Sequence, residues 1–190
     1  MVLKVVLHNI RSVYNVGAIL RTCEGFGVNE VVLSGYTPRY DDQSLLPHLR
    51  DKLNKQIAKT ALGAEELLDI YSSGDIFTDL TEWKKQGFKI VGLENNIQDV
   101  RLKRLDDPKL KDEIGEKVVL ILGEEVDGID QKLYELIDVF VEIPMRGKKE
   151  SFNVSVAAGI AIYGLNFTKS DIAVNFFFLF FFAAALGGGK

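Results

Sequence analysis

Residues 123–128 have the spacing of a phosphate-binding loop but not its charges. Glu124 and Glu125 follow Gly123, and Ile129-Asp130 stands where such a loop has Lys-Ser or Lys-Thr. Carboxylates without that cation would repel phosphate, so ATP and GTP chemistry is disfavoured. An acidic, glycine-rich loop suits a ligand with a cationic or hydroxyl-rich group. The alternative is a tight strand-to-helix turn, capped by Asp127 or Asp130.

A second candidate segment, residues 143–155, combines three cations with residues that cap helices. Arg146, Lys148 and Lys149 could contact phosphates. Ser151 and Asn153 stand where side-chain oxygens cap a helix that is predicted over 153–165. The alternative interpretation is a capped basic loop with no further role.

The third candidate is Arg21, on a helix predicted over 15–26 with Asn15 as its cap. At about 100° per residue, Arg21 lies off the apolar stripe of this helix. Gly17 is one turn earlier on the same face and is expected to leave open space beside the guanidinium. The alternative is a surface arginine paired with Glu24.

Strand and helix patterns alternate along the chain. Strands are predicted over 3–7, 30–33, 89–93, 118–122 and 139–143, with a possible short strand over 76–78; the other predicted helices cover 59–71, 80–86 and 130–137. This alternation predicts an α/β fold with a mostly parallel sheet and helices on both faces. Ligands of such sheets bind beyond the carboxyl ends of the strands, which places 92–94, 123–128 and 144–153 at the functional edge.

Composition limits the classes of protein that remain. A length of 190 residues suits one domain. A single cysteine excludes an intramolecular disulfide framework, and with only two histidines a Cys/His zinc site is not expected. The net charge of −4 excludes a uniformly basic nucleic-acid coat protein but is compatible with a local basic patch. Residues 35–57 are predicted to be a long polar loop and residues 95–116 to be irregular, and long loops are often functional.

The two ends of the chain have patterns of their own. Residues 1–7 lack the pattern of a targeting signal and read as a strand, so we expect a cytoplasmic protein. Residues 176–186 are eleven consecutive apolar residues, too few to span a bilayer. The tail, 169–190, could be a membrane or partner-docking segment, a core or dimer-packing segment, or a segment foreign to the fold. The predicted domain is therefore 1–168, and membrane association is not expected.

Together, the three candidate segments resemble the signature motifs of the SpoU-type (TrmH-like) RNA methyltransferases of the SPOUT superfamily. Asn15, Gly17 and Arg21 match the first motif; Leu122, Gly123, Glu125 and Gly128 match the second; Ile143 through Gly147, Ser151, Asn153, Val154 and Ser155 match the third, where Phe152 replaces leucine. The resemblance covers about residues 3–168.

The resemblance implies transfer of a methyl group from S-adenosylmethionine to a ribose 2′-hydroxyl of tRNA or rRNA. It also implies a trefoil knot built from roughly 118–165, and a homodimer with the active site near the subunit interface. Leu93, Gly123, Ile143 and Phe152 should line the cofactor site, with Met145, Ser151 and Asn153 close by.

The resemblance assigns catalysis to Arg21, with Asn15 and Glu125 to orient it. Because a guanidinium rarely gives up its proton, either a substrate phosphate relays the proton or Arg21 stabilises the developing alkoxide while another group accepts the proton. RNA, and not DNA, is the expected partner; the candidate contacts are Arg39, Arg50, Lys52, Lys55, Lys59, Arg146, Lys148 and Lys149.

Three alternatives stay open. The chain could be a non-catalytic RNA-binding or assembly protein on the same fold, although Asn15, Arg21 and Glu125 are all present. It could methylate a base nitrogen, although the first motif favours ribose. It could be a membrane-tethered interaction protein, which depends only on the phenylalanine-rich tail.

Overall fold

The computed structural model describes residues 1–95 and 97–167, and its centre is a seven-stranded sheet. The strands are β1 (Val2–His8), β2 (Glu30–Ser34), β3 (Ile70–Ser72), β4 (Lys89–Leu93), β5 (Leu102–Arg104), β6 (Lys117–Leu122) and β7 (Val139–Glu142). Their order is β3-β2-β1-β6-β4-β7-β5, and every neighbouring pair is parallel. The predicted α/β class with a parallel sheet is confirmed.

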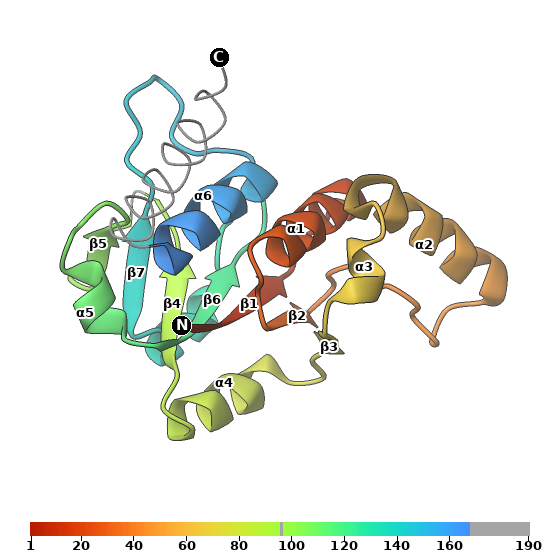
Figure 1. Ribbon diagram of the computed structural model, residues 1–190, viewed down its shortest axis with the longest axis horizontal. Helices are drawn as coiled ribbons and strands as arrows, with labels where there is room; N and C mark the ends of the chain where they lie inside the picture. Colours follow the sequence, from red (N-terminus) through yellow and green to blue (C-terminus); the bar gives the residue numbers. More distant parts are fainter. Residues whose placement is uncertain (96, 168–190) are drawn as a thin grey trace, which may run out of the picture.

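Helices cover both faces of the sheet (Figure 1). They are α1 (Val13–Gly25), α2 (Pro47–Ala61), α3 (Ala64–Leu67), α4 (Ile76–Lys85), α5 (Leu110–Ile114), the 3-10 helix η1 (Gln131–Leu136) and α6 (Val154–Asn166). Figure 1 shows α1 between α6 and α2 on one side of the sheet, with α4 on the other.

The strands β1, β2, β4, β6 and β7 contribute side chains to two separate cores, because successive side chains point to opposite faces. In β1, Val5 and Leu7 pack in the core that includes α1 and α6, whereas Val6 packs with Leu80 and Trp83 of α4. All three β1 residues are fully buried. Continuous apolar runs such as 118–122 follow from burial on both faces.

The strand order brings three distant segments to one edge of the sheet. Leu93 at the end of β4 is in register with Leu122 at the end of β6 and with Val141 in β7. The chain segments that follow these strands therefore emerge side by side, as predicted for 92–94, 123–128 and 144–153. The trefoil knot itself stays a prediction.

Several predicted elements are wrong. The predicted loop over 35–57 contains most of α2, and no helix spans 59–71. Pro47 is at the first helical position of α2, where its missing N–H costs nothing. Residues 76–78 begin α4 rather than forming a strand, because Asp75 caps the helix by accepting from the Phe77 N–H at 3.1 Å. Short elements β3, β5 and α5 were not predicted.

Two expectations about α1 also need correction. Its N-cap is Ser12, whose hydroxyl accepts from the Asn15 N–H at 3.3 Å, so Asn15 is not the cap. Gly17 does not border open space: a Cβ there would overlap Thr60 and Ile57 of α2. Its role is to let α1 and α2 approach closely.

The part of the chain in the structure contains no helix long and apolar enough to cross a membrane. The tail predicted over 169–190 lies outside the described residues.

Candidate functional site

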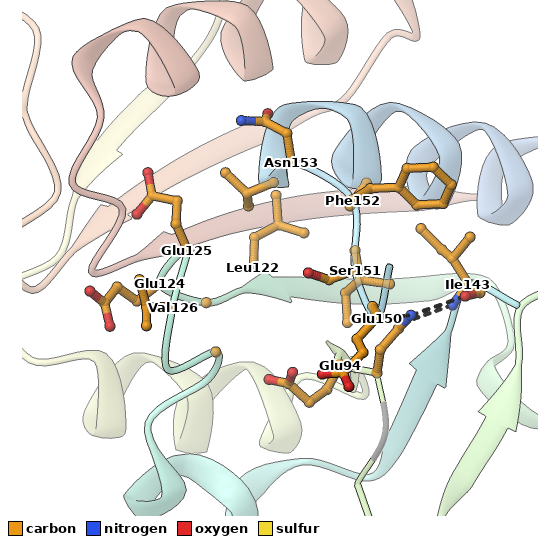
Figure 2. A pocket seen from close by; sticks show the side chains of 16 residues that line it. Glu94, Leu122, Glu124, Glu125, Val126, Ile143, Glu150, Ser151, Phe152 and Asn153 are labelled. Atoms are coloured by element: carbon orange, nitrogen blue, oxygen red, sulfur yellow. Dashed lines mark hydrogen bonds between the residues drawn. The ribbon is translucent and has the colours of Figure 1, made fainter. Parts of the chain in front are cut away.

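A cavity of about 400 Å³ lies at the carboxyl edge of the sheet (Figure 2). Its walls come from the ends of β4 and β6, the loop after β7 and the first turn of α6. It is lined by Leu93, Glu94, Asn95, Leu122, Gly123, Glu124, Glu125, Val126, Gly128, Ile143, Glu150, Ser151, Phe152, Asn153, Val154 and Ala157. The three segments singled out by sequence meet here only in part, since α1 contributes no lining residue.

Most residues predicted to surround a cofactor line this cavity. They are Leu93, Gly123, Ile143, Ser151, Phe152 and Asn153; Met145 is not among the lining residues. Glu94, Glu124 and Glu150 also line the cavity; they lie within the segments 92–94, 123–128 and 144–153 predicted at the functional edge, although none was assigned to the cofactor site. Asn95 lies outside those segments and was missed, and its position just after the predicted strand 89–93 was the available signal.

The loop over 123–128 is a tight turn that requires glycine at positions 123 and 128. The Glu124 N–H donates to the Gly128 carbonyl at 2.9 Å, and the Gly128 N–H donates back to the Glu124 carbonyl at 3.1 Å. A Cβ at Gly123 would overlap the backbone of Gly128 and Ile129. Gly128 has φ +73°, and a Cβ there would overlap the Glu94 carboxylate. Asp130 caps η1 by accepting from the Lys132 N–H at 3.0 Å; this was one of the two predicted caps.

Glu125 ties this loop to the start of α1. Its carboxylate accepts hydrogen bonds from the Arg11 N–H (3.1 Å), the Ser12 N–H (3.1 Å) and the Asn15 side-chain amide (3.0 Å). Burial alone would raise the pKa of Glu125, but these three hydrogen bonds outweigh it and hold the pKa below its ordinary value. The carboxylate is therefore charged at neutral pH and fixed in position.

Stability in acid is expected to depend on Glu125. Because its folded pKa is lowered, its contribution is fully present above the unfolded pKa and is lost as the pH falls through the folded pKa. We expect Glu125→Gln to lower the free energy of unfolding at neutral pH by about 1–2 kcal/mol. The difference from wild type should shrink below about pH 4. Urea unfolding at neutral pH and in acid measures this.

The matched control is Glu135→Gln, at an exposed residue of η1. It should change stability little at either pH. A Glu125→Gln deficit that persists in full at pH 3 would show that the lost contacts do not depend on charge.

Asn15 and Asn153 join the three segments into one hydrogen-bonded chain. The Asn153 amide donates to the Asn15 side-chain oxygen at 3.2 Å, and Asn15 in turn donates to Glu125. Asn153 also caps α6 by accepting from the Ser155 N–H at 2.9 Å, as predicted. Ser151 does not act as the cap. The order Glu125–Asn15–Asn153 thus runs along one border of the cavity.

Glu94 and Asn95 line another part of the cavity. The Asn95 side chain accepts from the Ile143 N–H at 3.1 Å and donates to the Ile143 carbonyl at 3.1 Å. The Glu94 carboxylate accepts from the Ile129 N–H at 2.9 Å. Burial raises the pKa of Glu94, and hydrogen bonds from the Ile129 and Asn95 N–H groups oppose this only partly. Both side chains therefore fix loops that line the cavity.

The electrostatic character of the cavity matches the ligand expected from the acidic loop. Its lining includes Glu94, Glu124, Glu125 and Glu150, and none of the described lining residues is basic. The Arg11 guanidinium lies 2.8 Å from the Glu124 carboxylate and compensates part of this charge. The remaining carboxylates favour a cation or a group with several hydroxyls over a phosphate.

Arg21 is exposed on α1 and does not line the cavity. Among the ion pairs of the described residues, none joins Arg21 to Glu24, so the plain surface pairing is not formed. The hydrogen bonds of Asn15 and Glu125 link these side chains to each other and to Asn153 rather than to Arg21. Their role in orienting Arg21 stays a prediction.

The cations predicted to contact RNA fall into two groups. Lys52, Lys55 and Lys59 are exposed on α2, and Arg146, Lys148 and Lys149 are exposed in the loop after β7. Two others already have partners. Arg50 donates to the Gln43 side chain at 2.6 Å and lies 3.5 Å from the Asp41 carboxylate. Arg39 is half-buried and donates to the Gly35 carbonyl at 3.5 Å.

The fold and the sequence are similar to those of known RNA-modifying enzymes. A 23S rRNA (guanosine-2′-O-)-methyltransferase from Xylella fastidiosa is 34% identical over 161 residues, covering 85% of this chain and 57% of the relative. A tRNA (guanosine(18)-2′-O)-methyltransferase from Aquifex aeolicus is 30% identical, covering 82% of this chain and 64% of the relative. The chain thus spans little more than half the length of such relatives.

A solved structure shows the same fold. The AdoMet-bound rRNA methyltransferase from Sinorhizobium meliloti superposes with a TM-score of 0.68 at 20% identity, over 86% of this chain and 55% of that one. The model of the SpoU rRNA methylase family matches residues 2–163, which include all three motifs. The chain therefore belongs to the SpoU rRNA methylase family.

Proposed function

We propose that this chain transfers a methyl group from S-adenosylmethionine to a ribose 2′-hydroxyl of tRNA or rRNA. The observation that carries the proposal is the hydrogen-bonded chain Glu125–Asn15–Asn153, which joins one residue from each family motif. Glu125 and Asn153 line the cavity, and Asn15 links them. Both relatives described above are named as guanosine 2′-O-methyltransferases, one of rRNA and one of tRNA.

The cavity suits S-adenosylmethionine by the chemistry of its lining. The ligand carries a sulfonium and an ammonium group against one carboxylate, so its net charge is positive, and it also has ribose hydroxyls. The lining supplies carboxylates and no basic side chain. Leu93, Ile143 and Phe152 provide apolar surface for its adenine. When bound, the cofactor supplies a methyl group activated by the positive sulfur.

Arg21 would serve as the electrostatic group for the ribose. Its guanidinium is permanently charged, so it binds a phosphate or stabilises negative charge on the 2′-oxygen rather than acting as a free base. The proton then passes to a substrate phosphate or to water. Asn15, six residues earlier on α1, ties the start of this helix to two residues that line the cavity, Glu125 and Asn153.

The proposal includes a homodimer. Val156 and Tyr163 lie seven residues apart on α6 and are 49% and 43% exposed, and Phe152 beside the cavity is 42% exposed. Val156 and Tyr163 on α6, with Phe152 just before the helix, give an exposed apolar surface next to the candidate site, which a second copy of the chain would cover. We expect the enzyme in the cytoplasm with its RNA substrates.

Transfer of labelled methyl from S-adenosylmethionine to unmodified tRNA and rRNA tests the proposal. Nuclease digestion of the product should place the label on ribose, as a nuclease-resistant dinucleotide. Label on a base would favour the base-methylating alternative. No label, with cofactor still bound, would favour a non-catalytic RNA-binding protein.

A further inference from the structure

We infer that α2 carries a binding track for single-stranded RNA that leads to Tyr14, in the first turn of α1. The inference rests on the proposed function, since it takes RNA to be the substrate. It adds that the RNA runs along the outer face of α2 and that the RNA bound there is single-stranded. The track consists of Lys52, Lys55, Lys59 and Tyr14.

The lysines of α2 form a single stripe. Lys52, Lys55 and Lys59 are exposed and follow one another at intervals of three and four residues. At about 100° per residue they fall within an arc of about 60° around the helix axis, and they span about 10 Å along it. The buried residues Ile57 and Ala61 lie on the far side of α2, against the core. The stripe therefore faces outward along its whole length.

The positive charge of this stripe is not neutralised within the described part of the chain. No ion pair found there involves any of the three lysines. The single carboxylate of α2, Asp51, lies near the edge of the arc, so the outer face keeps a net positive charge. Arg50 is on another face and is paired with Asp41. In a chain of net charge −4, such a stripe suits a polyanion.

The stripe ends at an exposed aromatic ring. The Lys59 ammonium lies 5.7 Å from the centre of the Tyr14 ring, which belongs to a residue that is 47% exposed. The Thr60 hydroxyl donates to the Tyr14 carbonyl at 3.0 Å and fixes α2 to the first turn of α1. The next residue along the chain, Asn15, donates to Glu125 at the cavity. The track therefore ends at the helical turn that Asn15 ties to Glu125, a residue that lines the cavity.

Lysines that follow a backbone, together with an aromatic platform, are how proteins hold single strands. The lysines bind successive phosphates, and a base stacks on the ring whatever its sequence. In an A-form duplex the bases are stacked inside and cannot reach such a ring. The geometry therefore favours a single-stranded segment or loop over a duplex.

Salt dependence of RNA binding tests the lysine stripe. The probe is a labelled, unstructured RNA of about 20 nucleotides, and its affinity for the full chain is measured by fluorescence anisotropy between 50 and 200 mM salt. Each phosphate contact contributes about 0.7 to the slope for a single strand, so Lys52→Gln/Lys55→Gln/Lys59→Gln should reduce the slope by about 2. The matched control, Lys89→Gln/Lys109→Gln/Lys132→Gln, removes the same charge from exposed residues elsewhere and should leave the slope unchanged.

Substitution of Tyr14 tests the stacking platform. Tyr14→Leu should weaken binding of the single strand by about 5- to 150-fold without changing the salt slope, whereas Tyr14→Phe should bind as wild type. Binding of a duplex of the same length should not respond to Tyr14→Leu.

Equal slope changes in the two triple variants, or none in the α2 variant, would overturn the track. Equal effects of Tyr14→Leu on duplex and single strand would overturn the single-strand assignment. Methyl transfer by the wild type is measured in parallel, so that the two proposals fail separately. A wild type that binds RNA through the stripe but transfers no methyl group refutes the proposed function and leaves the track standing.

Discussion

Replacing Arg21 with alanine is expected to lower the rate of methyl transfer by about 10²- to 10³-fold, the effect of removing one donor that stabilises developing negative charge. Arg21 is exposed on α1 and lines no part of the cavity, so stability and cofactor binding should stay at wild-type values. Single-turnover transfer at saturating RNA and cofactor, with a separate titration of S-adenosylmethionine, measures both.

Two further variants show whether the loss in Arg21→Ala is specific to this guanidinium. Arg104→Ala removes another exposed guanidinium, on β5, and should transfer methyl groups as wild type does. Arg21→Lys keeps the charge but not the planar arrangement of donors, so it should recover little activity. If Arg21→Lys keeps most of the rate, a role that needs the planar guanidinium is wrong.

Gly123→Ala is expected to be the most damaging small substitution at the site. The new Cβ would overlap the backbone of Gly128 and Ile129, which cannot move aside without opening the turn that lines the cavity. Overpacking of this kind costs about 1–3 kcal/mol of stability or more. Because the turn forms a wall of the cavity, we also expect S-adenosylmethionine to bind at least about tenfold more weakly, which corresponds to about 1.4 kcal/mol.

The matched control for this variant is Gly74→Ala, where the added Cβ meets nothing within 4 Å. Its stability should stay within about 0.5 kcal/mol of wild type. Thermal unfolding and calorimetric titration of both variants give the comparison. If Gly123→Ala binds the cofactor with unchanged affinity, the turn over 123–128 is not part of the cofactor site.

The sequence predicted best those elements whose burial leaves a strong local pattern. Residues 118–122 are apolar without interruption and form most of β6. Asn153 caps α6, as its position at the start of the predicted helix 153–165 suggested. The elements that it missed depend on distant contacts. The α2 helix packs against Gly17, thirty residues before it begins, and β3 and β5 are only three residues long. Such short strands exist because a neighbouring strand pairs with them.

The same distinction applies to the candidate site. The three motifs identified Asn15, Glu125 and Asn153 from their local spacing. Their hydrogen bonds to one another span 110 and 138 residues of sequence, so the contacts themselves could not be predicted without the fold. Asn95 was missed because its function is to bridge the end of β4 to Ile143, which follows β7.

If the acceptor is a ribose 2′-hydroxyl, the most direct test uses an RNA that lacks only that group. Once the labelled nucleotide has been mapped, the same RNA is prepared with a single 2′-deoxyribose at that position. We expect transfer to this RNA to be abolished while its binding is retained. Continued transfer to the 2′-deoxy nucleotide would place the methyl group on the base and rule out the ribose 2′-hydroxyl as the acceptor.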